Sequence, residues 1–229
     1  MVQIIQIRIR ILRLTVITGT LSSLFLRTVP SNKPEVERFV ADTDMTTSIS
    51  QLLTAMLELS SSLDINLHTA CFEKIEKDCQ KYPVDSCKFA GNYSEYYSRD
   101  ESAGVDDSTE DSSVPKTCWL DAFVIHSIPI LIDISHQFAA DRDLLQYHTP
   151  RNLLLSLTCE LGNLAEVFQF KGDSDDQEMV SVAEKVTIGH KIANVTMYLL
   201  RLADACNVSV QGMKQTTNQL DIPVVKDSL

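Results

Sequence analysis

Glycine is scarce in this sequence, with seven residues in 229, and the motifs that depend on glycine are missing. Neither G-x-x-x-x-G-K-[ST] nor G-x-G-x-x-G occurs, and there is no G-x-S-x-G. These absences exclude the phosphate-cradling loops of P-loop and dinucleotide-binding proteins and the nucleophile elbow of α/β-hydrolases.

Paired cysteines and clustered histidines are also absent. No C-x-x-C pair occurs, and the five histidines lack the spacing of metal ligands. We interpret the cysteines as free thiols in a reducing compartment, which predicts a cytoplasmic protein; a disulfide framework or a zinc site is the alternative. The six cysteines are Cys71, Cys79, Cys87, Cys118, Cys159 and Cys206.

Acidic side chains are missing from the first 34 residues, which carry five basic ones. The remainder holds 15 basic and 31 acidic residues, a formal charge of −16, against −11 for the whole chain. A body this acidic repels nucleic-acid backbones and anionic membranes, so we expect no nucleic-acid partner.

Residues 1–30 form an apolar, basic N-terminal segment that includes IRIRILRLTVITGTLSSLFL. Three interpretations stay open: a signal or organellar transit segment, a non-native extension, or an apolar strand. The first would direct the chain to an organelle or the secretory pathway. Its apolar run is short for a membrane span.

Apolar residues recur with helical spacing in three later stretches, so we predict an all-α fold. Thr149 and Pro150 have the residue types of a helix start, and Pro129 predicts a kink or break in a helix over residues 120–143. The stripes are Ile49, Leu52, Met56, Leu59 and Leu63, then Leu154, Leu157, Leu161, Leu164 and Phe168, then Ile192, Val195, Leu199, Leu202 and Cys206. A shorter helix is expected to end near Lys81.

Residues 99–116 are acidic, rich in serine and nearly free of large apolar side chains, as in a disordered linker. They divide the chain into helical blocks at residues 31–98 and 117–229. Shifting residues 49–67 by 143 positions aligns apolar residues of the two blocks, which is weak evidence of a duplication.

Polar residues share a face on two of the predicted helices. Ser156, Glu160 and Asn163 lie on one helix, and Lys191, Asn194 and Tyr198 lie on a later one. If the two helices pack through their apolar stripes, the polar residues line one cleft.

The stretches YHTPRNLLL and FQFKG, within residues 138–172, and NVTMYLLRLADACNVSV at residues 194–210 resemble the MazG-like all-α nucleoside triphosphate pyrophosphohydrolases, especially the dCTP pyrophosphatases. The segment KIEKDCQKYPVDSCK, residues 74–88, is similar to a later part of the same domain. The resemblance implies a MazG-like four-helix-bundle type of fold, with one complete domain copy at 117–229 preceded by a partial copy at 31–98.

The resemblance also implies a metal site, with E-x-x-E on one helix and E-x-x-D on another holding Mg²⁺ for attack by water at a phosphorus. Here Glu160 keeps the first position as the candidate catalytic residue and metal ligand, while Asn163 and Asn194 are degenerate ligands. Lys191 occupies the remaining ligand position. Our hypothesis is that its ammonium replaces the metal and pairs with Glu160, with a solvent-facing Lys191 as the alternative.

By the same resemblance, nucleotide-binding positions fall at His148, Phe170 and Tyr198 for the base and at Lys74 and Asp78 for phosphate or ribose. The implied reaction is cleavage of dCTP to dCMP and pyrophosphate with Mg²⁺. The alternative is a catalytically inactive paralogue that binds nucleotides or acts as an assembly partner. Either implies a homo-oligomer, or a hetero-oligomer with active relatives.

Overall fold

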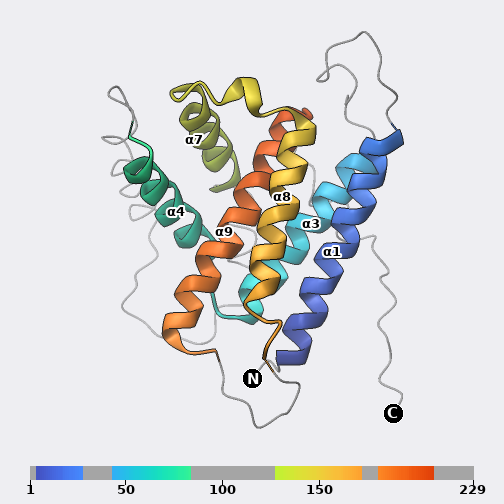
Figure 1. The fold of residues 1–229 in the computed structure, drawn as a ribbon, viewed down its shortest axis with the longest axis vertical. Helices are drawn as coiled ribbons and strands as arrows, with labels where there is room; N and C mark the ends of the chain where they lie inside the picture. Colours follow the sequence, from blue (N-terminus) through green and yellow to red (C-terminus); the bar gives the residue numbers. More distant parts are fainter. Residues whose placement is uncertain (1–3, 28–42, 84–126, 172–179, 209–229) are drawn as a thin grey trace.

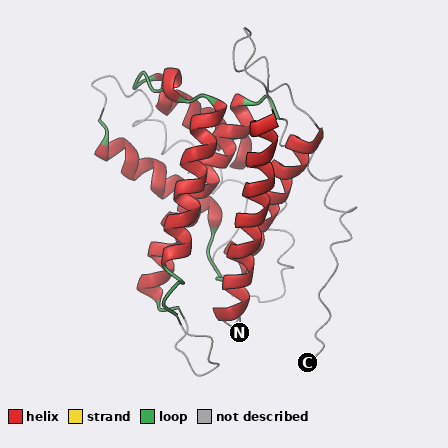
Figure 2. Cartoon of the chain, turned by 45° about the vertical axis from the view of Figure 1, so that its right-hand side comes forward, coloured by secondary structure: helices red, strands yellow, loops and turns green. Residues whose placement is uncertain are grey.

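The computed structural model describes residues 4–27, 43–83, 127–171 and 180–208, and within these ranges it contains six α-helices, one short 3₁₀ helix and no strand (Figures 1 and 2). The predicted all-α class is therefore confirmed. The acidic linker at 99–116 and the cysteines Cys87 and Cys118 lie outside the described residues. The helices are α1 (Ile4–Arg27), α3 (Thr43–Ser62), α4 (Leu67–Lys81), α7 (Ile128–Ala140), η2 (Leu145–Tyr147), α8 (Pro150–Glu166) and α9 (Val182–Ala205).

Four long helices form a bundle. Helix α8 packs along α9 and α1 packs along α3, while contacts between α3 and α9 and between α1 and α8 join the two pairs (Figure 1). Leucine and isoleucine residues of all four helices meet in one core, which excludes water from their apolar stripes. Helices α4 and α7 pack against α9, and this brings residues 67–81 beside residues 182–205.

Helix starts follow local chemistry. The side chains of Asn66 and Thr149 accept backbone hydrogen bonds from Thr69 and Asn152 at the starts of α4 and α8. Pro150 occupies the first turn of α8, as its fixed φ angle favours. Pro129 likewise lies in the first turn of α7, where no amide hydrogen is required. The predicted helix over residues 120–143 includes residues 120–126, which lie outside the described residues, so the kink or break at Pro129 stays a prediction.

The N-terminal segment forms helix α1, so the strand interpretation of this segment is wrong. Its inner face is buried in the core through Ile7, Leu14 and Leu21. The guanidinium groups of Arg10 and Arg13 lie 3.2 and 3.4 Å from the carboxylate of Glu58 on α3. Residues Ile4–Leu26 are long and apolar enough to cross a membrane by length and composition, but a core helix can pass the same test, and α1 packs on α3 and α8.

The outer face of α1 is apolar as well. Ile9, Leu12 and Val16 are 51%, 64% and 69% exposed, and they follow one another at helical spacing. Among the described cysteines, Cys71, Cys79, Cys159 and Cys206 are free thiols, which agrees with the sequence interpretation. Burial raises the pKa of the Cys71 thiol, which keeps it protonated and unreactive.

Candidate functional site

The predicted site residues on α8 and α9 lie together where these two helices pack. The carboxylate oxygen Oε2 of Glu160 accepts a hydrogen bond from Asn194 Nδ2 at 2.9 Å and another from Asn163 Nδ2 at 3.3 Å. The first bond crosses from α9 to α8, and the second links residues one turn apart on α8. The packing of α8 on α9 thus brings together polar residues that were expected to meet only if these helices pack, and we call this cluster the Glu160 site.

Lys191 lies one turn before Asn194 on α9 and is partly exposed. Within the described part of the chain its ammonium makes no ion pair, with Glu160 or with any other acidic side chain. The predicted Lys191–Glu160 pair is therefore not formed, because the two amides already hold the carboxylate. Lys191 remains an uncompensated positive charge beside the Glu160 site.

Tyr198, one turn after Asn194, is partly buried between the site and α4. Burial raises the pKa of Tyr198, and the negative charges of Glu160 and Asp78 raise it further, while a hydrogen bond with Ser156 lowers it. These influences place α8, α9 and α4 around one phenol group. The phenol stays protonated near neutral pH and can donate a hydrogen bond.

Helix α4 supplies the remaining polar groups. Lys74 forms an ion pair with Asp78 one turn later, so these two charges largely cancel. Arg142, which follows α7, donates a hydrogen bond to the carbonyl oxygen of Tyr82 at 2.7 Å and fixes the end of α4. The two residues predicted on the first block, Lys74 and Asp78, thus come near the Glu160 site because α4 packs on α9.

Two predicted base-contacting residues lie elsewhere. Phe170, beyond the end of α8, is 91% exposed and presents no packed aromatic surface. His148 follows η2, and burial lowers its pKa, with the positive charge of Arg201 acting in the same direction. Its role, like that of Phe170, stays a prediction.

Sequence reasoning missed a charged cluster around the buried Arg201. Arg201 on α9 is 5% exposed, and its guanidinium lies 2.6 Å from the carboxylate of Asp204 and 3.3 Å from His136 Nδ1 on α7. The available signal was an arginine between Leu200 and Leu202 in the apolar stripe of α9. A charge in that position is buried only with a partner, and Asp204 is that partner.

The donor set does not fit a tightly bound Mg²⁺ ion, which prefers octahedral coordination by oxygen atoms, usually with carboxylates among them. The described residues contain no group of three or more histidine, cysteine, aspartate or glutamate side chains able to hold a metal. At the Glu160 site one carboxylate already accepts two N–H groups. The Lys191 ammonium adds a positive charge at a position where the family resemblance implies a carboxylate.

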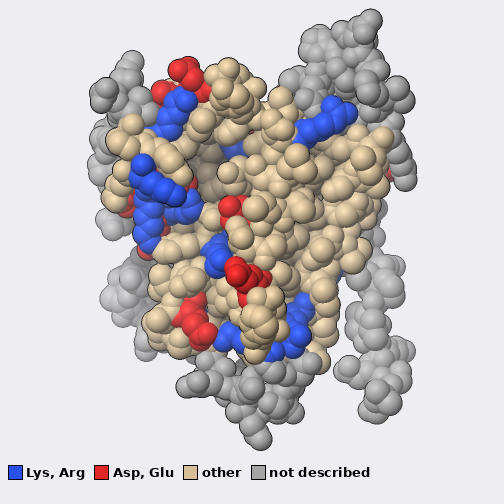
Figure 3. All heavy atoms as spheres, in the orientation of Figure 1, with Lys and Arg blue, Asp and Glu red and all other residues tan. Residues whose placement is uncertain are grey.

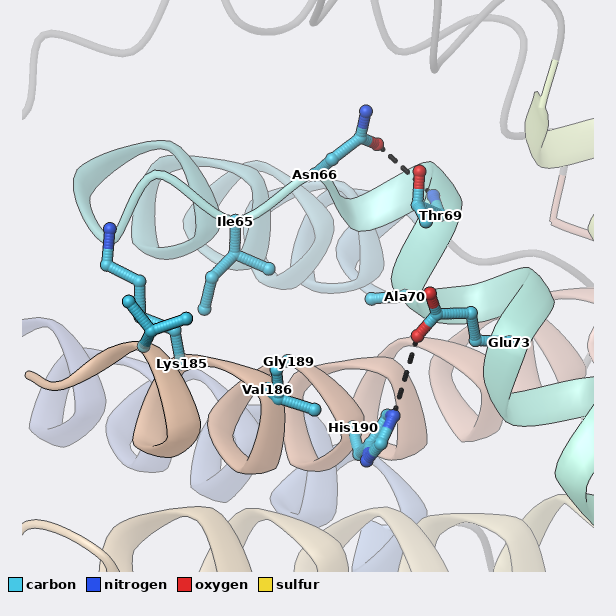
Figure 4. Close-up of a pocket in the computed structure, with 10 residues that line it drawn as sticks. Ile65, Asn66, Thr69, Ala70, Glu73, Lys185, Val186, Gly189 and His190 are labelled. Atoms are coloured by element: carbon cyan, nitrogen blue, oxygen red, sulfur yellow. Dashed lines mark hydrogen bonds and ion pairs between the residues drawn. The ribbon is translucent and has the colours of Figure 1, made fainter.

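A separate groove lies between the start of α4 and the first half of α9 (Figure 4). A Cβ atom added at Gly189 would lie 3.5 Å from Ile65 Cγ2 and 3.8 Å from Ala70 Cβ, which is ordinary van der Waals contact. His190 and Glu73 face each other at one end, 3.6 Å apart, and Lys185 lies at the other. The lining residues are Ile65, Asn66, Thr69, Ala70, Glu73, Val182, Lys185, Val186, Gly189 and His190.

Charged side chains gather over α4 and the lower part of α9 on the face drawn in Figure 3, whereas the surface over α8 and α1 is largely uncharged. The Glu160 site lies where α8 meets α9.

The all-helical fold of the described residues agrees with the sequence comparisons. Part of the chain is homologous to the MazG-like nucleoside triphosphate pyrophosphohydrolases. The relatives are dCTP pyrophosphatase 1 proteins: the chain is 38% identical to that of Bos taurus over 109 residues, which are 44% of this chain and 64% of the relative. It is 42% identical to that of Homo sapiens over 86 residues, 36% of this chain and 51% of the relative.

The match to the protein of Rattus norvegicus is 39% over 103 residues, 42% of this chain and 61% of the relative. The chain thus spans less than two thirds of each of these relatives. No family model and no solved structure matches it. The homology therefore covers less than half of this chain.

Proposed function

We propose that this chain binds a nucleoside triphosphate of the dCTP type at the Glu160 site and has little or no pyrophosphatase activity. Homology to dCTP pyrophosphatase 1 supports the ligand class. The observation that carries the loss of activity is the Glu160 carboxylate, which two amides hold at 2.9 and 3.3 Å.

Pyrophosphatase chemistry depends on how a site compensates the negative charge of the phosphates. Pyrophosphate release from a nucleoside triphosphate needs stabilisation of negative charge on the phosphates and a positioned water, and a cluster of metal-bound carboxylates commonly supplies both. Here Asn163 and Asn194 take carboxylate positions and Lys191 takes a third. The groups that remain can orient a nucleotide: Tyr198 offers an aromatic face and a hydroxyl group, and Lys191 offers a positive charge.

Binding and turnover of dCTP test this proposal with the full chain. We expect saturable binding in calorimetry, and pyrophosphate release no faster than in buffer, with or without Mg²⁺. Tyr198→Leu should weaken binding about tenfold because a stacked base loses its aromatic partner. Tyr147→Leu, an exposed position on η2, is the matched control.

Mg²⁺-dependent release that disappears in Glu160→Ala would contradict the loss of activity and identify a residual pyrophosphatase. In that case one carboxylate with amide neighbours suffices for the reaction. Absence of dCTP binding to a folded chain would overturn the nucleotide-binding function itself.

We infer a second role, assembly with another copy or with active relatives, from the outer face of α1. Ile9, Leu12 and Val16 form an exposed apolar stripe, and burying such a surface favours association. Leu12→Lys combined with Val16→Lys should reduce the mass measured by light scattering to that of a monomer. Gln80→Lys on α4 should leave the mass unchanged, and a wild-type chain that is already monomeric would exclude the role.

We also infer that residues 31–98 are a partial copy of the domain at 117–229. The 143-residue shift aligns parts of α3 and α9, whose main packing partners are the long helices α1 and α8 respectively. In this interpretation α4 belongs to the first copy but serves the site of the second.

A further inference from the structure

We propose that the Glu160 site binds its nucleotide without a divalent cation, with the Lys191 ammonium as the positive charge that a metal would otherwise supply. This inference rests on the proposed nucleotide-binding function and concerns how the same site neutralises its ligand. It follows from the disagreement between the oxygen ligands that Mg²⁺ requires and the groups that this chain provides.

Glu160 cannot readily serve as a metal ligand. Its Oε2 atom accepts N–H groups from α8 and from α9, so a cation at that oxygen would have to displace or rotate two amides. Rotation would break the hydrogen bond at 2.9 Å that joins the two helices. The hydrogen bonds of the carboxylate oxygen are therefore made to protein groups and not to a metal.

Asn194 has one further atom to satisfy. Its Oδ1 atom is buried and has no hydrogen-bond partner in the described part of the chain. A buried acceptor without a donor costs free energy, so a ligand that brings a hydroxyl or amino group there is favoured. A nucleoside carries such donors on its ribose and, for cytosine, on its base.

The lysines of α4 and α9 differ in whether an acidic side chain neutralises them. Lys74 is paired with Asp78, and Lys185 lies 3.5 Å from Asp64 in the groove of Figure 4. Lys77 lies 2.7 Å from the imidazole of His190. Lys191 has no acidic partner within the described residues and is one turn from Asn194, so it is the ammonium best placed to contact a phosphate.

Calorimetric titration of dCTP into the full chain tests this inference, once in EDTA and once in Mg²⁺. We expect dCTP to bind in EDTA with a dissociation constant no larger than that in Mg²⁺, because Lys191 neutralises the free phosphates and the Mg²⁺ complex of dCTP carries less negative charge. Lys191→Gln should weaken binding about tenfold in both buffers, as expected for the loss of one charge-assisted hydrogen bond. Lys185→Gln on the same helix should bind like the wild type.

The outcomes separate this inference from the function on which it rests. Binding that appears only with Mg²⁺, or that Lys191→Gln leaves unchanged, would overturn the inference while the nucleotide-binding function stands. No binding of dCTP in either buffer would overturn the proposed function. Tyr198→Leu provides the common check, because it should weaken binding in both buffers.

Discussion

A single carboxylate, Glu160, shows how amide groups can stabilise a charge in a position typical of a metal ligand. Two N–H donors hold it at 2.9 and 3.3 Å, and hydrogen bonds to charged groups are stronger than those between neutral groups. The amides of Asn163 and Asn194 thus supply the donors that the Glu160 carboxylate needs. Amides at these two positions are therefore compatible with a stable helix pair.

Restoring the carboxylates should restore metal binding. The triple variant Asn163→Glu, Lys191→Glu and Asn194→Asp places four acidic side chains on adjacent turns of α8 and α9. We expect Mg²⁺ affinity, measured by calorimetry, to rise at least about tenfold over the wild-type chain, because hard cations prefer carboxylate oxygens. Lys185→Glu changes charge outside the site and should not bind Mg²⁺ more tightly; a folded triple variant without added affinity would contradict the expectation.

Residue spacing predicted that Glu160 and Asn163 share one face of a helix, because helical periodicity fixes which side chains face the same way. The position of Asn194 beside them was expected only on the condition that the two helices pack together, and from the family resemblance. Spacing was not enough to predict the partners of Lys191, since a long flexible side chain has many conformers of similar free energy. The pair of buried Arg201 and partly exposed Asp204 was also missed, although its members lie three residues apart on one helix. The position of His136 beside Arg201 depends on α7 packing over α9, which no local pattern encodes.

At the level of helices, the start of α9 combines two interactions with one carboxylate. Glu184 accepts hydrogen bonds from the backbone and hydroxyl of Ser181, and it pairs with Lys171 at 2.6 Å. The hydrogen bond from Lys171 and those from Ser181 lower the pKa of Glu184 to about 2. Lys171 follows α8, so this carboxylate joins the end of one site helix to the start of the other.

The pH dependence of stability should reveal this cap. Because the pKa of Glu184 is lower in the folded than in the unfolded state, its stabilisation is present above its ordinary value of 4.5 and is lost as the pH falls toward 2. Glu184→Gln should lower the free energy of unfolding by about 1 kcal/mol near pH 7. That difference, measured by urea denaturation, should shrink as the pH falls below 4.5.

Glu166→Gln, at an exposed position on α8, is the matched control and should change the free energy of unfolding little at any pH. An equal effect of Glu184→Gln at acidic and neutral pH would show that the carboxylate charge does not act at this helix start.

Helix positions were largely predictable from sequence because caps and apolar spacing are local. The start of α8 agrees with the expectation drawn from Thr149 and Pro150, and the end of α4 agrees with the expected end near Lys81. The role of α1 was not predictable. A basic, apolar segment at the N-terminus has the composition of a targeting sequence, and only its packing on α3, with Glu58 facing its arginines, places it in the core.

On the scale of the whole molecule, the bundle joins helices that are far apart in sequence. Helix α1 contacts α8 across more than a hundred intervening residues, and α4 lies against α9 across a similar interval. Such long-range pairing is invisible to periodicity, which reports only that each helix has an apolar face. The sequence therefore predicted the all-α class, whereas the structure was needed to show which helices pack against one another.

The position of α4 on α9 has a consequence for how the site is formed. In a site shared between two separate subunits, completeness depends on protein concentration, because dilution separates the halves. In this protein α4, α8 and α9 belong to one polypeptide, so they meet within the molecule at a fixed effective concentration. A nucleotide site built from α4, α8 and α9 should therefore stay complete at any dilution.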